Sequence, residues 1–113
     1  MLEKEIENQI LDFLDHVPEC FAWKNQNTGV YDPTRKAFRK SHSKHQFKGV
    51  SDILGVYKGR FLAIEVKQPK KKLTDHQQNF LDNIKLQGGI GFMATSVIDV
   101  IEGLDLNEDG RFS

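Results

Sequence analysis

Two carboxylates and a lysine stand at a spacing that suits phosphodiester chemistry. Glu65 and Lys67 lie in the apolar run 61–67, where unpaired charges are costly. Such a run predicts a buried strand, and the alternation of side chains along a strand places Glu65 and Lys67 on one face. Asp52 stands upstream, at the start of a second apolar segment. If the two strands are neighbours, the three side chains converge on one rigid surface.

The chemistry of these groups indicates a metal-dependent phosphodiesterase. A phosphodiester is shielded by negative charge, and a divalent cation neutralises that charge and makes water a better nucleophile. Asp52 and Glu65 offer the hard oxygen ligands that Mg²⁺ or Mn²⁺ prefers, and the Val66 carbonyl offers a third. Lys67 is placed to orient or deprotonate the attacking water and to offset developing charge.

Composition narrows the class of protein. The 113 residues suffice for one domain with a modest core. Cys20 is the only cysteine, which excludes an internal disulfide and a multi-cysteine zinc site. No apolar stretch approaches the roughly 20 residues that cross a bilayer, and the charged N-terminus lacks the pattern of a secretory signal. We therefore expect a cytoplasmic protein with no membrane partner.

A net charge of zero, from 16 basic and 16 acidic residues, conceals a basic central region. Between residues 24 and 72 only Asp32, Asp52 and Glu65 oppose the positive charges. Such a region predicts contacts to the phosphates of a polyanion, and such contacts carry no sequence information. The alternative is a solvated surface that only aids solubility. The residues predicted to contact phosphates, and to bind DNA if the polyanion is DNA, are Arg35, Lys36, Arg39, Lys40, Lys44, Lys48, Lys70, Lys71 and Lys72.

Periodicity and turn signals predict an α/β domain with a small mixed β-sheet flanked by helices. The expected elements are a helix over about 3–16, a strand at 20–23, a long polar connection over 25–48, strands at 53–57 and 61–66, a helix over 74–86, a strand at 90–95 and a short helix after Ser96. The domain is expected to span 1–104, with a polar C-terminal tail over 105–113.

Three motifs together resemble the VRR-NUC branch of the PD-(D/E)XK nuclease superfamily. They are Gly-Val-Ser-Asp-Ile-Leu at 49–54, Phe-Leu-Ala-Ile-Glu-Val-Lys at 61–67 and Leu-Thr-x-x-Gln at 73–77. The resemblance implies a restriction-endonuclease-like core and Mg²⁺- or Mn²⁺-dependent cleavage of DNA that leaves a 5′-phosphate and a 3′-hydroxyl. It implies a stand-alone, often phage-borne enzyme, similar to Holliday-junction resolvases, that acts as a homodimer on branched DNA.

The resemblance also implies a metal-site glutamate on the first helix. Helical spacing from Ile6 and Ile10 favours Glu3 first and Glu7 second, while solvated helix acids are an equal alternative. Gln77 either closes a capping box with Thr74 or points toward the metal, and the resemblance favours the metal.

Two other functions stay open. A sequence-specific restriction-type endonuclease shares the same motifs, although no base-reading element is evident. A DNA-binding module without catalysis would share the basic region, but its carboxylates and lysine would then have no role. A protein–protein module outside the nucleases is poorly supported by the basic region.

Overall fold

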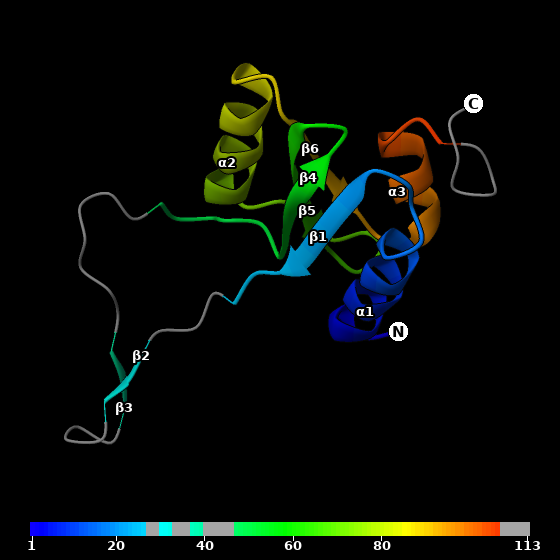
Figure 1. Ribbon diagram of the computed structural model, residues 1–113. Helices are drawn as coiled ribbons and strands as arrows, with labels where there is room; N and C mark the ends of the chain where they lie inside the picture. Colours follow the sequence, from blue (N-terminus) through cyan, green and yellow to red (C-terminus); the bar gives the residue numbers. More distant parts are fainter. Residues whose placement is uncertain (27–29, 33–36, 40–46, 107–113) are drawn as a thin grey trace.

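The computed structural model describes residues 1–26, 30–32, 37–39 and 47–106, with the backbone alone at 30–32 and 37–39. Its centre is a four-stranded sheet in the order β1-β4-β5-β6 (Figure 1). These strands are β1 (Cys20–Lys24), β4 (Ile53–Tyr57), β5 (Arg60–Val66) and β6 (Ile90–Ala94). β1, β4 and β5 pair antiparallel, whereas β5 and β6 pair parallel. The sheet is therefore mixed, as predicted.

The parallel pair follows from the connection between its strands. Parallel neighbours need a crossover, and α2 (Asp75–Leu86) supplies it. A two-residue turn at Lys58 and Gly59 joins β4 to β5, so this pair is a tight hairpin in which Ile53 faces Ile64. Asp52, directly before β4, is thereby brought beside the far end of β5.

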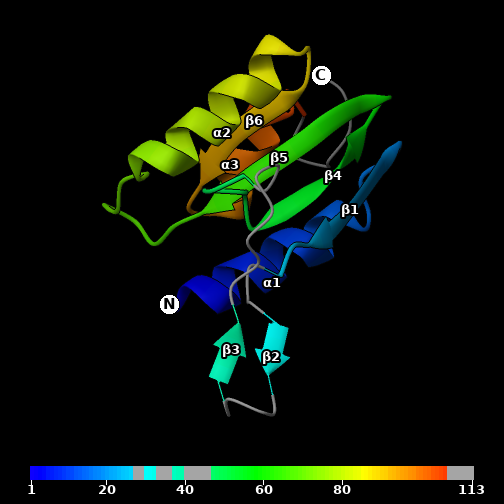
Figure 2. The ribbon, with the colours of Figure 1, turned by 90° about the vertical axis from the view of Figure 1, so that its left-hand side faces the viewer.

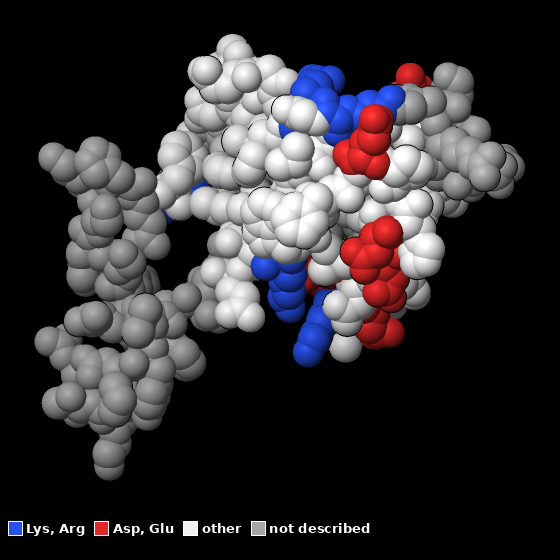
Figure 3. Space-filling view, viewed as in Figure 1, with Lys and Arg blue, Asp and Glu red and all other residues white. Residues whose placement is uncertain are grey.

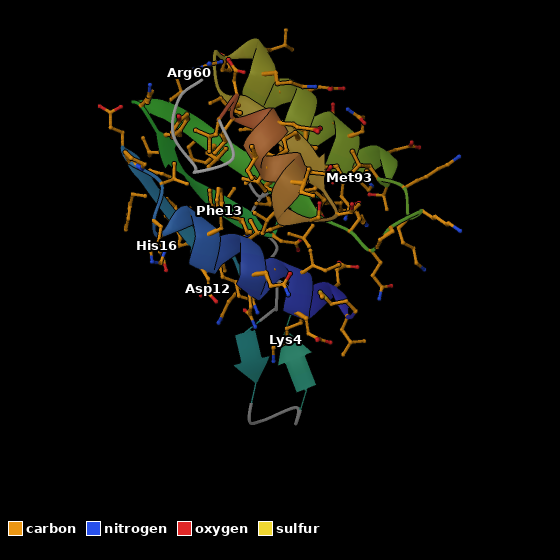
Figure 4. All side chains as sticks on the ribbon, turned by 90° about the vertical axis from the view of Figure 1, so that its right-hand side faces the viewer. Lys4, Asp12, Phe13, His16, Arg60 and Met93 are labelled. Carbon is orange, nitrogen blue, oxygen red and sulfur yellow. The ribbon has the colours of Figure 1, made fainter. Side chains whose placement is uncertain are left out.

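Helices cover both faces of the sheet. α1 (Glu3–Leu14) and α3 (Val97–Gly103) lie on one face and α2 lies on the other (Figure 2). The core between α1, α3 and the sheet contains Ile10, Leu62 and Val100, all fully buried. Figure 4 shows Lys4, Asp12 and His16 along the flank of α1 that is turned away from the sheet. The α/β class with a restriction-endonuclease-like core is confirmed.

The prediction of a connection without strands over residues 25–48 is partly wrong, because this segment contains a β-hairpin. β2 (Val30–Asp32) and β3 (Ala37–Arg39) pair antiparallel in a separate two-stranded sheet. Strands of three residues carry too little apolar alternation to stand out from the polar, turn-forming residues around them. The proposed turn at Asp32 and Pro33 lies partly outside the described residues.

The remaining predicted elements agree with the structure to within one or two residues at their ends. Leu106, beyond the predicted boundary at 104, is 8% exposed and belongs to the core. Residues 107–113 lie outside the described part, so the tail stays a prediction. Among the described residues, the helices are all too short or too polar to cross a membrane.

Candidate active site

Asp52 is held by backbone contacts on both sides. Its Oδ2 accepts a hydrogen bond of 2.9 Å from the Val66 amide, and its carbonyl accepts one of 2.7 Å from the Asn25 amide. The first bond ties the side chain to β5, and the second ties the main chain to the segment that follows β1. Ser51, directly before it, is fully buried. The carboxylate is therefore fixed at the end of β5, next to Glu65.

Glu65 lies almost wholly inside the protein, with 3% of its surface exposed. Burial, and after it the negative charge of Asp52, raise the pKa of its carboxyl to about 8. The two carboxyl groups are therefore close enough for the charge of Asp52 to act on Glu65. Oε1 accepts a hydrogen bond of 2.9 Å from Gln77, whereas Oε2 is buried without a hydrogen-bond partner in the described part of the chain.

Lys67 is half-buried on the same side of β5 as Glu65. Its positive charge opposes the effect of burial and lowers the pKa of Glu65. Its backbone amide donates to the Ala94 carbonyl at 3.0 Å, which extends the parallel pairing of β5 and β6. The structure thus brings Asp52 beside Glu65, and the charge of Lys67 acts on Glu65 from two residues further along the chain.

Gln77 closes the predicted capping box and also contacts Glu65. Its Oε1 accepts from the Thr74 amide at 2.9 Å, while the Thr74 hydroxyl accepts from the Gln77 amide at 3.2 Å, so the capping box is complete. Its Nε2 donates to Glu65 Oε1 at 2.9 Å. Turning the side-chain amide over would break both contacts, because an NH₂ group would then face an N–H donor. One side chain therefore links the start of α2 to the buried carboxylate.

The two glutamates proposed from the first helix lie in different environments. Glu7 is 8% exposed and its Oε1 lies 3.5 Å from Lys24 Nζ, whereas Glu3 is exposed. Burial raises the pKa of Glu7, the Lys24 ammonium lowers it, and the charge of Asp52 raises it again. Glu3 acts on Glu65 and on Glu7 through its charge. Glu7 is therefore buried and Glu3 exposed, and the charges of both interact with the Asp52 and Glu65 pair; we call these four residues the acidic cluster.

Lys24 is a member of the site that the sequence analysis missed. It ends β1, and its side chain reaches the buried Glu7 on α1. No local pattern predicts this contact, because it depends on how α1 is rotated against the sheet. The one available signal was the position of Lys24 after an apolar strand, where a buried acid on a neighbouring helix would attract it.

The predicted DNA-binding lysines that the structure describes are exposed. Lys70, Lys71 and Lys72 follow β5 directly, and Lys48 precedes the segment that carries Asp52. These four are near the acidic cluster in sequence and open to solvent. For Arg39 only the backbone is described, and Arg35, Lys36, Lys40 and Lys44 lie outside the described residues.

The donor set fits a hard divalent cation. Two adjacent carboxylates repel each other, and the buried Glu65 Oε2 has no hydrogen bond to compensate its loss of water. A cation between Asp52 and Glu65 would satisfy both. The described residues contain no cluster of three or more His, Cys, Asp or Glu side chains arranged around one ion. Mg²⁺ needs no such cluster, since it commonly binds through one or two carboxylates and keeps several waters.

Comparison with known proteins decides the family. The VRR-NUC domain matches residues 19–97, which is most of the chain and includes Asp52, Glu65, Lys67 and Gln77. The chain belongs to the VRR-NUC domain family. The resemblance stated from the three motifs is thereby confirmed. The match begins after α1, so Glu3 and Glu7 lie outside it.

Two curated relatives of this VRR-NUC chain are Holliday junction resolvases named RecU. The protein from Bacillus subtilis (strain 168) is 29% identical over 90 residues, which cover 74% of this chain and 44% of the relative. The protein from Leuconostoc mesenteroides is 30% identical over 84 residues, which cover 68% of this chain and 38% of the relative. The chain thus spans less than half the length of these relatives.

Proposed function

We propose that the chain is a structure-specific DNA endonuclease that hydrolyses phosphodiesters in branched DNA, such as four-way junctions, with Mg²⁺ or Mn²⁺. The observation that carries the proposal is the convergence of Asp52 and a buried Glu65 whose Oε2 lacks a partner in the described part. The VRR-NUC family and the junction-resolving relatives supply the substrate class.

Each residue of the site has a distinct role in the proposed reaction. Asp52, Glu65 and the Val66 carbonyl would hold the cation, which supplies Lewis acidity at the phosphate and activates water. The hydrogen bond from the Val66 amide and that from Gln77 aim the two carboxylates. Lys67, beside Glu65, orients the attacking water and offsets charge that develops on the phosphate. The products are a 5′-phosphate and a 3′-hydroxyl.

Glu7 is the better placed of the two helix glutamates for a part in the site, because it is buried beside Asp52 and Lys24. Glu3 is kept as the alternative, since its charge reaches Glu65. Replacing each by Gln and measuring Mn²⁺ affinity separates them: the glutamate that serves the cation loses affinity, and the other variant matches wild type.

DNA is the proposed partner, gripped through its backbone by Lys48 and by Lys70, Lys71 and Lys72, which are exposed near the site. Contacts of this kind carry no sequence information. They suit an enzyme that recognises the shape of a junction. The homodimer is likewise proposed, because two sites are needed to cut opposing strands of a junction.

Asp52→Asn provides the direct test. Asn keeps an oxygen that accepts from the Val66 amide, so the fold is expected to survive, while the charge that holds the cation is lost. We expect cleavage of a four-way junction in Mg²⁺ to fall roughly a hundred-fold or more. Asp82→Asn, on the exposed side of α2, is the matched control and should cut normally.

The outcomes separate the rival functions. Junction binding without cleavage by wild type, in both Mg²⁺ and Mn²⁺, would leave a DNA-binding module. Discrete bands from linear duplex would establish a restriction-type enzyme. Cleavage by Asp52→Asn at the wild-type rate would show that the chemistry lies elsewhere in the chain. A panel of linear, flap, splayed and four-way DNA examines all three.

A further inference from the structure

The backbone of Gly49 lies directly against the first turn of α2. Its φ is +79°, a value that residues with a side chain rarely adopt. A Cβ at this position would lie 2.7 Å from the Gln77 amide nitrogen, and it would come closer still to the backbone carbonyl group of His76. Both atoms belong to the main chain of a helix, so neither can move aside cheaply. Residue 49 is therefore closed to any side chain.

This contact completes a ring of interactions around the candidate site. Gly49 is three residues before Asp52, whose Oδ2 is bound to the Val66 amide on β5. The neighbouring Glu65 accepts from Gln77, and Gln77 lies in the helix turn that Gly49 touches. The loop that carries one acid and the helix that aims the other are thus pressed together at one point.

A second contact holds the same loop to the same helix. The rings of Phe47 and Phe80 lie with their centroids 5.7 Å apart. Phe47 is two residues before Gly49, and Phe80 is one helical turn after Gln77. Segment 47–49 therefore runs along the start of α2, and Gly49 is its point of closest approach to the helix.

We propose that Gly49 is a positioning residue of the site. Its bare backbone sets the distance between the segment that carries Asp52 and the helix turn that carries Gln77, and it thereby keeps Gln77 Nε2 on Glu65. A side chain at residue 49 would separate loop from helix and release Gln77 from the carboxylate. The effect on cleavage rests on the proposed nuclease function; the effect on Gln77 does not.

Gly59 offers a closely matched control. Its φ is +78°, almost the value of Gly49, but a Cβ there would meet nothing within 4 Å. Gly49→Ala and Gly59→Ala therefore share the cost of placing an alanine in the left-handed region. The contact with α2 is added in Gly49→Ala alone. Any difference between the two variants reports that contact.

The first readout is the Gln77 side-chain amide in ¹⁵N–¹H spectra of the metal-free protein. In Gly49→Ala we expect its resonances to move toward those of an exposed glutamine, whereas Gly59→Ala leaves them in place. Unchanged Gln77 resonances in a folded Gly49→Ala protein would overturn the proposal. Phe80→Ala removes the ring contact with Phe47 without adding a clash, and it should move the same resonances by a smaller amount. If Gly49→Ala does not fold, Phe80→Ala takes its place as the test. Unchanged Gln77 resonances in Phe80→Ala would then overturn the proposal.

The second readout is a double-mutant cycle on junction cleavage. Gly49→Ala should lower the rate roughly ten-fold or more, because a small misplacement of catalytic groups is costly. Gly59→Ala should stay close to wild type. In a Gln77→Ala background the same Gly49→Ala change should cost only about two- to three-fold, because the two residues act together. Fully additive losses would contradict action through Gln77. If wild type cuts no DNA, the nuclease proposal fails, and the amide spectra still decide the role of Gly49.

Discussion

Burial places the Glu65 carboxyl where its charge is costly unless a cation binds beside it. The folded protein holds a proton there up to a pKa of about 8, whereas the unfolded chain releases it near the ordinary value of 4.5. The protonated Glu65 carboxyl therefore makes its full contribution to the free energy of unfolding below the unfolded pKa of 4.5. That contribution is lost as the pH rises through the folded pKa of about 8. Under the proposed function, a cation bound beside Glu65 would offset this cost to the metal-free fold.

Glu65→Gln tests this balance. Gln keeps an oxygen for Gln77 and carries no charge, so in EDTA the variant should be more stable than wild type by roughly 1 to 2 kcal/mol at pH 8.5 and by little at pH 5. Adding Mn²⁺ should stabilise wild type alone. Thermal unfolding across this pH range measures both effects, with Glu102→Gln, exposed on α3, as control. A wild-type protein with a higher melting temperature than Glu65→Gln at pH 8.5 without metal would contradict this expectation.

The sequence predicted those site residues that belong to short, contiguous motifs. Asp52, Glu65, Lys67 and Gln77 belong to short motifs whose order along the chain predicts their convergence. The ion pair of Glu7 and Lys24 joins a helix to a strand that follows it after a turn, and it depends on how the helix is rotated on the sheet. The helical period of the apolar residues does not fix that rotation. For this reason the sequence favoured Glu3 over Glu7 as the metal-site glutamate.

Among the elements, α2 joins fold stability to the site through its first turn. Thr74 and Gln77 cap the helix, and the same Gln77 aims Glu65. Capping signals and helical period made this helix predictable to within one residue of its start. The hairpin of β2 and β3 was not predictable, since strands of three residues are too short for an alternating pattern to stand out.

Thr74→Ala should therefore do more than weaken a helix. Loss of the hydroxyl that accepts from the Gln77 amide costs about 1 kcal/mol, and fraying of the first turn should lower junction cleavage several-fold. Ser96 caps α3 in the same manner, by accepting from the Asp99 amide at 3.4 Å. Ser96→Ala should lose some stability and keep its cleavage rate. Urea unfolding and cleavage assays compare the two, and equal losses of activity would refute the special role of α2.

For the whole molecule, α2 covers only part of its face of the sheet. Phe21, Val56 and Phe61 form a cross-strand row on that face, and the Trp23 ring lies 5.4 Å from the Phe21 ring. Phe21 is 72% exposed, and the other three are between 38% and 40% exposed. Figure 3 shows a broad uncharged area in this part of the surface, with Lys and Arg gathered above and below it. An apolar row without basic side chains suits a protein contact better than a DNA backbone.

The proposed homodimer would find a surface in this row. Phe61 lies on the same side of β5 as Glu65, so two copies joined here would carry their acidic clusters beside the shared interface. Phe21→Glu should then give a monomer in sedimentation velocity while the melting temperature of the fold changes little, because Phe21 is already exposed. Ile98→Glu, at a comparably exposed position on α3, should remain a dimer. A wild-type protein that stays monomeric on junction DNA would defeat the homodimer, and a Phe21→Glu protein that still dimerises would assign the interface to another surface.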